Sequence, residues 1–123
     1  MTRLLDALPG SEPSFPFGPE VRVSKVGGKM FALVALEEKP LRINLKCDPE
    51  FALVLRENNA SIEPGYHMNK RHWNTVVLDG GVERDEFVGL VRHSYALIVT
   101  SLTRKKRDAL VKLGLDLDTL ETR

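Results

Sequence analysis

The fold is decided by the segment at residues 20–46, which reads EVRVSKVGGKMFALVALEEKPLRINLK. Apolar and polar side chains alternate in part up to Gly27-Gly28, a two-residue signal for a β-hairpin turn. The following stretch, 29–36, is apolar almost throughout, which predicts a strand in the centre of a sheet. A third strand with one wet face is predicted over 41–46, where the alternation is clean. Three strands with short connections predict an antiparallel meander.

Helical patterns lie on both sides of this meander. A short helix is expected over 2–8, and Asp48 is expected to cap a second helix that ends at Asn58-Asn59. The buried stripe of the second helix is predicted at i, i+3, i+4 spacing: Phe51, Val54 and Leu55.

The longest helix is expected over 83–100, and a last one over 104–113 with Gly114 at its end. With a strand pair within 64–79, the order becomes α-β-β-β-α-β-β-α-α. We therefore predict a two-layer α+β fold, an antiparallel sheet of about five strands with helices on one face.

Size and composition are those of an ordinary globular chain. The 123 residues, 42% hydrophobic and 28% charged, predict a single domain over 1–123. Within it, 1–19 is expected to hold the first helix and a proline-rich loop, and 114–123 a flexible acidic tail. Phe15 and Phe17 in that loop are expected to tuck under the sheet.

Several classes of protein are excluded or disfavoured by the sequence. A net charge of +1 argues against purely electrostatic, histone-like binding to nucleic acid but permits local basic patches. A single cysteine, Cys47, excludes an internal disulfide and suits a reducing compartment. No apolar run approaches the roughly 20 residues of a membrane span, and the N-terminus lacks a signal-peptide pattern. We expect a cytoplasmic protein without membrane contact; the oligomeric state stays open, with a monomer slightly favoured.

The most unusual segment is PGYHMNKRHWNTVVLD at 64–79, a polar, cationic stretch followed by a β-branched run. If Asn69-Lys70 form the centre of a tight hairpin turn, Tyr66 pairs with Trp73 across it. Lysine suits the second turn position less well than glycine, so a longer loop or one helical turn is the alternative.

This segment has a functional and a structural interpretation. In the functional one, Lys70 and Arg71 meet phosphates, Asn69 and His72 form hydrogen bonds, and an aromatic ring stacks on a base or sugar. In the structural one, Trp73 and Tyr66 belong to the core and the cations merely solvate the loop. Strand alternation puts Trp73 on the face opposite Val76 unless a bulge intervenes, and the sequence leaves this open.

A second basic region accompanies the segment. Residues 21–46 contain six lysines and arginines against two glutamates, and Arg42, Asn44 and Lys46 would line the open face of the third strand. The predicted nucleic-acid-binding residues are therefore His67, Asn69, Lys70, Arg71, His72, Trp73, Arg42, Lys46 and Lys25.

Other chemistry has little support. His67 and His72, with Cys47 or Asp48, give only a weak metal signal, so we expect neither metal nor cofactor. His93 is expected to be a hydrogen-bonded or solvent-facing histidine without a catalytic partner. Phosphate-binding glycine loops, paired catalytic carboxylates and a serine elbow are absent from the sequence, which favours a binding protein over an enzyme.

Five short motifs resemble the MmcQ/YjbR family: FPFGPE at 15–20, GKMFA at 28–32, NLKCDP at 44–49, PGYHMNKRHW at 64–73 and LDG at 78–80. The resemblance covers roughly residues 9–113, and the histidine-rich block is its most specific part. It implies a small bacterial cytoplasmic protein with a YjbR-like, two-layer α+β fold. It also implies a DNA-binding role, predicted for the family through a "double wing" comparison.

The leading hypothesis is thus a DNA-binding or other nucleic-acid-binding protein that uses the 64–79 hairpin and a basic sheet face. The alternative is a small-molecule or phosphate-type anion-binding protein, with catalysis left open, that uses His67, His72 and Arg42 around a pocket. A third hypothesis is a protein-interaction module that uses the sheet or the acidic tail.

Overall fold

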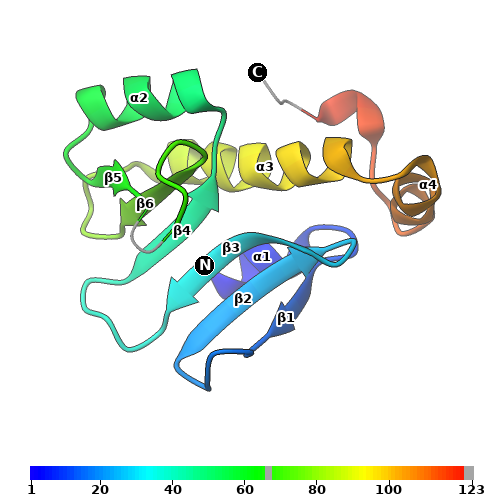
Figure 1. Cartoon of the computed structure of the whole chain (residues 1–123), viewed down its shortest axis with the longest axis horizontal. Coiled ribbons are helices and arrows are strands. Elements are labelled where there is room, and N and C mark those ends of the chain that lie inside the picture. The colour runs from blue at the N-terminus through cyan, green and yellow to red at the C-terminus, as the bar shows by residue number, and fades with distance from the viewer. Residues whose placement is uncertain (66–67, 121–123) are drawn as a thin grey trace.

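The computed structural model describes residues 1–65 and 68–120, and within them a six-stranded antiparallel sheet (Figure 1). The strands follow the order β1-β2-β3-β4-β6-β5 across the sheet. Their bounds are β1 Glu12–Ser14, β2 Val21–Val26, β3 Lys29–Ala35, β4 Arg42–Lys46, β5 Ile62–Pro64 and β6 Trp73–Val77. The strand beyond the expected five is β1, a three-residue edge strand within the proline-rich loop. An edge position tolerates Pro13, which lacks a backbone N–H, and pairing with β2 is a tertiary contact that local pattern does not reveal.

The helices complete the predicted two-layer α+β arrangement. In Figure 1, α1 and α3 lie behind the sheet, and α2 lies beside the β5–β6 end. Their bounds are α1 Thr2–Ala7, α2 Pro49–Asn58, α3 Arg84–Ser101, α4 Arg104–Lys112 and a short 3₁₀ turn, η1, Leu117–Thr119. None of the described helices covers the other face of the sheet, which is turned toward the viewer in Figure 1. No described helix is long and apolar enough to cross a membrane.

The main core lies between the sheet and α3. It contains Val34, Ile43, Leu45 and Val76 from the strands and Phe87, Leu90, Val91, Ile98 and Val99 from α3. A register shift between β2 and β3 pairs Ser24 with Ala32 but Lys25 with Met30, so Phe31 is the extra residue and is fully buried. Ser94 ties α3 to the strands: its Oγ donates to the Phe31 carbonyl (2.5 Å) and accepts from the Lys46 N–H (2.9 Å).

Local signals set most helix ends where the sequence predicts them. The Asp48 carboxylate accepts from the Phe51 N–H, Thr103 caps α4, and Gly114 adopts the left-handed conformation (φ 107°) after it. The predicted stripe of α2 is wrong at Val54, which is 53% exposed, whereas Ala52 is fully buried. Because α2 packs over the sheet's β5–β6 end, it buries a narrower strip than expected.

The sequence predicts a flexible acidic tail over 114–123. Of this segment the structure describes 114–120, where Leu115 is buried and Leu120 packs against the core. The first part of the predicted tail thus lies on the protein body.

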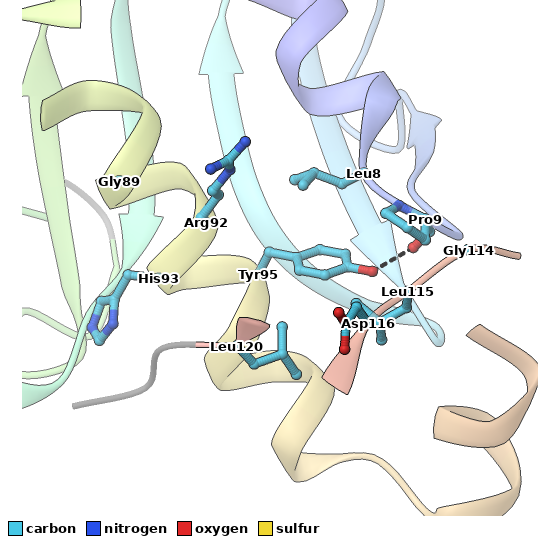
Figure 2. Close-up of a pocket in the computed structure, with 10 residues that line it drawn as sticks. All are labelled: Leu8, Pro9, Gly89, Arg92, His93, Tyr95, Gly114, Leu115, Asp116 and Leu120. Atoms are coloured by element: carbon cyan, nitrogen blue, oxygen red, sulfur yellow. Dashed lines mark hydrogen bonds between the residues drawn. The ribbon is translucent and has the colours of Figure 1, made fainter. Parts of the chain in front are cut away.

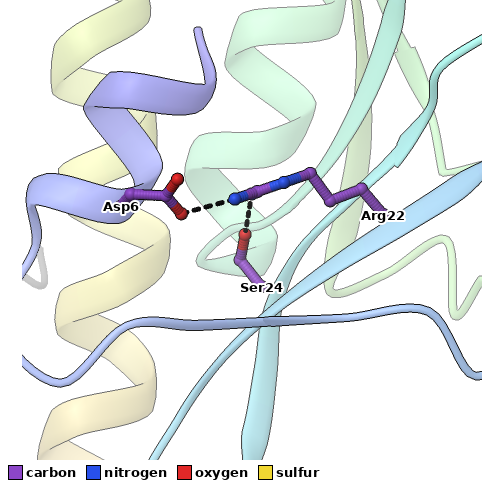
Figure 3. Close-up of polar contacts among 3 residues, drawn as sticks. All are labelled: Asp6, Arg22 and Ser24. Carbon is purple, nitrogen blue, oxygen red and sulfur yellow. Dashed lines mark hydrogen bonds and ion pairs between the residues drawn. The ribbon is translucent and has the colours of Figure 1, made fainter.

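Arg22 of β2 points to the helix side, not to the basic surface. It is 6% exposed, and its guanidinium donates to Asp6 of α1 (2.5 Å) and to Ser24 (3.1 Å), as Figure 3 shows. A buried guanidinium requires such partners because it cannot lose a proton and become neutral. This pair fixes α1 on the back of the sheet and removes one cation from the predicted basic region.

Substitution of Asp6 by alanine is expected to lower the free energy of unfolding by about 2 kcal/mol, since the buried Arg22 charge loses its carboxylate partner. Urea denaturation measures the change. Asp6→Ala combined with Arg22→Met should recover most of the loss, while Glu57→Ala, a matched control on α2, should change stability by less than about 0.5 kcal/mol. Equal effects of Asp6→Ala and Glu57→Ala would contradict the role of this pair.

Candidate nucleic-acid interface

β5 ends at Pro64 and β6 begins at Trp73, so their connection takes up positions 65–72, and its described part at 68–72 is a loop. The Gly65 N–H donates to the Trp73 carbonyl (2.9 Å), and Pro64 lies opposite Asn74. The two-residue turn at Asn69-Lys70 therefore does not form, and the longer-loop alternative is confirmed. A tight turn would need a residue that adopts positive φ readily where this chain has lysine. Tyr66 and His67, predicted to pair and bind here, lie outside the described residues.

Arg56 of α2 holds this loop from the helix side. Its Nε donates to Asn74 Oδ1 (2.7 Å), and its Nη2 donates to the carbonyls of Trp73 (3.1 Å) and Lys70. Just beyond the end of the neighbouring strand β4, the Cys47 N–H donates to the His72 carbonyl (2.8 Å). These bonds fix the backbone of 70–74, so its side chains extend from a positioned frame.

Gly65 permits the close approach of the loop to β6. A Cβ at this position would lie 2.7 Å from the Trp73 Cβ and 3.0 Å from the Trp73 carbonyl oxygen, far inside a normal contact. Neither Gly65 nor Arg56 was singled out from the sequence. In the sequence Arg56 is recognisable only as a basic residue in the last turn of a predicted helix. Its hydrogen bonds to the loop form only when α2 packs beside β6.

The side chains at the loop tip differ in exposure. Asn69, Lys70 and Arg71 are exposed, and His72 and Trp73 are half-buried. Asn69 has a structural role, since its Oδ1 accepts from the Arg71 N–H (3.1 Å). Within residues 1–65 and 68–120, neither Lys70 nor Arg71 forms an ion pair through its side chain. The structure thus presents two adjacent unpaired cations.

The β4–β6 register places Trp73 on the open face. Lys46 lies opposite Trp73, Asn44 opposite Thr75 and Arg42 opposite Val77, while Asn74 and Val76 face the helices. The alternation runs from Trp73 to Val77 without a bulge. Half-buried Trp73 therefore belongs neither to the core nor to a fully exposed platform.

The predicted basic sheet face is only partly present. The Arg42 guanidinium lies 3.8 Å from Glu38 and 4.0 Å from Glu63, so two carboxylates offset its charge. Lys25, half-buried on β2, is separated from β6 by β3 and β4. Of the predicted strand cations, Lys46 alone is brought next to the start of β6.

A groove of about 650 Å³ lies on the open sheet face. Its lining is mainly apolar, with Asn44 and Thr75 among the strand residues and Arg42 and Glu38 also present. Two loops contribute to it, one through Phe17 and one through Met68. The expectation that Phe15 and Phe17 tuck under the sheet is wrong: they are 48% and 66% exposed. The helix side is already filled by α1 and α3, so this loop borders the open face.

A second cavity, of about 430 Å³, lies on the helix side between α3 and the C-terminal segment (Figure 2). Tyr95 is buried there, and its hydroxyl donates to the Pro9 carbonyl (2.6 Å). Burial raises the pKa of Tyr95 to about 12. His93, whose side chain extends away from Tyr95 in Figure 2, accepts from the Asp48 N–H (3.2 Å), which confirms its expected hydrogen-bonded state. Among the described residues no three metal-ligating side chains cluster.

The fold and this surface define a class: a two-layer α+β protein whose uncovered sheet face is bordered by two loops. The YjbR family model matches residues 6–97, and the chain belongs to the YjbR family. Protein YbdF of Escherichia coli O157:H7 is 40% identical over 103 residues, 84% of each chain. Protein YjbR of Escherichia coli K12 is 37% identical over 107 residues, 87% of this chain and 91% of that one.

A solved structure supports the same assignment. The crystal structure of Deinococcus radiodurans protein DR2400, with a DUF419 domain, aligns with a TM-score of 0.84 at 42% identity over 94% of this chain and 86% of that chain. A Pseudomonas syringae protein aligns with a TM-score of 0.65 at 28% identity, over 78% of this chain and 96% of that chain. The predicted family and fold are thereby confirmed.

Replacement of Arg56 by methionine is expected to loosen the loop and lower the free energy of unfolding by about 2 kcal/mol, because Asn74 and two backbone carbonyls lose a charged donor. Limited trypsin digestion with mass mapping should show faster cleavage after Lys70 and Arg71. Arg84→Met, at the exposed start of α3, is the matched control and should leave those cleavage rates unchanged. Unaltered cleavage in Arg56→Met would contradict the anchoring role.

Stability is expected to fall as the pH rises from 10 to 12, because Tyr95 ionises at its ordinary pKa of 10.0 when unfolded but only near 12 when folded. Below pH 10 both states hold the proton and the contribution is constant. Urea denaturation from pH 7 to pH 11 measures the slope, and Tyr95→Phe should flatten it. An identical slope in both proteins would rule out Tyr95 as its source.

Proposed function

We propose that this protein binds DNA through the loop at 68–72, Trp73 at the start of β6 and the adjoining end of the open sheet face. The single observation that carries the proposal is the exposed Lys70–Arg71 tip, which has no ion pair among the described residues and lies on a backbone held by Arg56. Adjacent cations with fixed backbones suit phosphate oxygens, which accept most protein–DNA hydrogen bonds. Half-buried Lys46 and Trp73 extend this surface onto the strands.

The other residues predicted to bind nucleic acid contribute less to this proposed surface. Asn69 shapes the loop, His72 is half-buried beside it, and Arg42 is offset by two glutamates. The alternative is a pocket of His67, His72 and Arg42. His72 does not line the open-face groove that Arg42 borders, so this alternative gains no support from the described residues. A compact site of two or three cations agrees with the nearly neutral chain, since it needs no large net charge.

Lys70→Ala with Arg71→Ala is expected to weaken DNA binding about tenfold or more and to reduce the slope of log affinity against log salt by about 2, because two phosphate contacts are lost. Fluorescence anisotropy with labelled DNA across a salt series measures both quantities.

The control is Arg104→Ala with Lys105→Ala, which removes two exposed cations from α4 and changes the net charge equally. Its affinity and slope should stay close to those of the unaltered protein. Identical binding by the Lys70/Arg71 variant and the unaltered protein would remove the loop from the mechanism.

A further inference from the structure

The groove on the open face is lined mainly by apolar side chains that come from both loops and strands. Phe17 and Met68 border it from two separate loops, and Leu33 lines it from the central strand β3. Phe17 is 66% exposed, so much of a large aromatic ring faces solvent in the free protein. A ligand that packs on this ring would displace water from its apolar surface, and this displacement favours binding.

Asn44 adds a specific polar group to this apolar groove. It is only 8% exposed, and its Oδ1 accepts from the Thr75 hydroxyl (2.6 Å). Across residues 1–65 and 68–120, its side-chain amide nitrogen has no hydrogen-bond acceptor. This nitrogen is not among the fully buried atoms that lack a partner, so it is open to the groove that Asn44 lines. An occupant that supplies an acceptor would take the place of water at this donor.

We propose that the groove receives one unpaired base of single-stranded DNA. The ring would pack against Phe17 and Met68, and a ring carbonyl or ring nitrogen would accept a hydrogen bond from the Asn44 amide. This inference rests on the proposed function, because the phosphates beside that base would lie on Lys70 and Arg71. Met68 precedes Lys70 by two positions, so one loop borders the groove and carries the cations.

The chemistry of the groove favours a single strand over a duplex. In a duplex the bases are stacked and paired, and its outer surface offers phosphates and groove edges that suit an inserted helix or ribbon. A recessed apolar surface with an exposed phenylalanine instead suits unstacked bases, which pack on aromatic side chains. Glu38 beside Arg42 disfavours phosphate at that part of the lining, whereas Lys70 and Arg71 favour it on the loop.

Three labelled probes separate base recognition from phosphate binding. They are a single strand of about 12 nucleotides, the same strand in a duplex, and an abasic strand of equal length and charge. Fluorescence anisotropy at one salt concentration should show the ordinary single strand binding about tenfold more tightly than the other two probes. The abasic strand has no base to place in the groove, and the bases of the duplex are already paired and stacked.

Two variants test the groove itself. Phe17→Ala and Asn44→Ala should each weaken binding of the ordinary strand several-fold while leaving the abasic strand unaffected. Leu53→Ala is the matched control, because Leu53 is 56% exposed on α2, outside the groove lining, and it should change neither. Asn44→Ala removes the hydrogen bond to Thr75, and this loss could disturb the sheet. Phe17 lies on an exposed loop, so Phe17→Ala tests the groove without that effect.

The outcomes distinguish this inference from the proposed function. Equal affinity for ordinary and abasic strands, with both weakened by the Lys70/Arg71 variant, would overturn base recognition and leave phosphate binding intact. Tighter binding of the duplex would do the same. No binding of any probe would remove the proposed function and this inference together. A clear preference for RNA of the same sequence would overturn DNA as the ligand.

Discussion

The antiparallel pairing of β4 with β6 is the constraint on which the rest of this surface depends. These strands are separated in the chain by α2 and β5, yet lie side by side with Asn44 opposite Thr75. The buried hydrogen bond between these two side chains (2.6 Å) joins the strands on the open face, while Ile43 and Val76 join them in the core. A register shift of one residue would exchange the two faces, so Trp73 and Asn44 keep their places only with this pairing.

The same pairing decides how the loop after β5 is held. It brings the start of β6 beneath the last turn of α2, where Arg56 reaches two carbonyls and Asn74. Charged hydrogen bonds of this kind stabilise a loop more than neutral ones, and here they leave the cationic side chains free to point outward. The loop therefore combines a fixed backbone with an exposed tip, a combination suited to recognition because less ordering is needed on binding.

Ion pairs that form on folding decide which basic side chains of this protein keep an uncompensated charge, and the number of basic residues in a segment does not. Arg22 and Arg42, two of the six basic residues in the first strand region, are occupied by Asp6 and by Glu38 with Glu63. Lys70 and Arg71 have no such partner among the described residues. A nearly neutral chain can therefore present a small cationic site beside an apolar groove.

The sequence by itself predicted the four helices, most of the strands and the layer arrangement, but not the edge strand β1. Side-chain alternation, the Gly27-Gly28 turn, the Asp48 cap and Gly114 act over a few residues, so their structural consequences are local and readable. The five motifs also identified the YjbR family, which the family model and the relatives support.

Tertiary structure alone decided which of the predicted site residues meet. The Arg56 anchor, the exposure of Phe17, the neutralised Arg42 and the open-face position of Trp73 each involve residues far apart in the chain or the packing of whole elements. No local pattern encodes such contacts, because they arise only when strands pair and helices cover one face of the sheet.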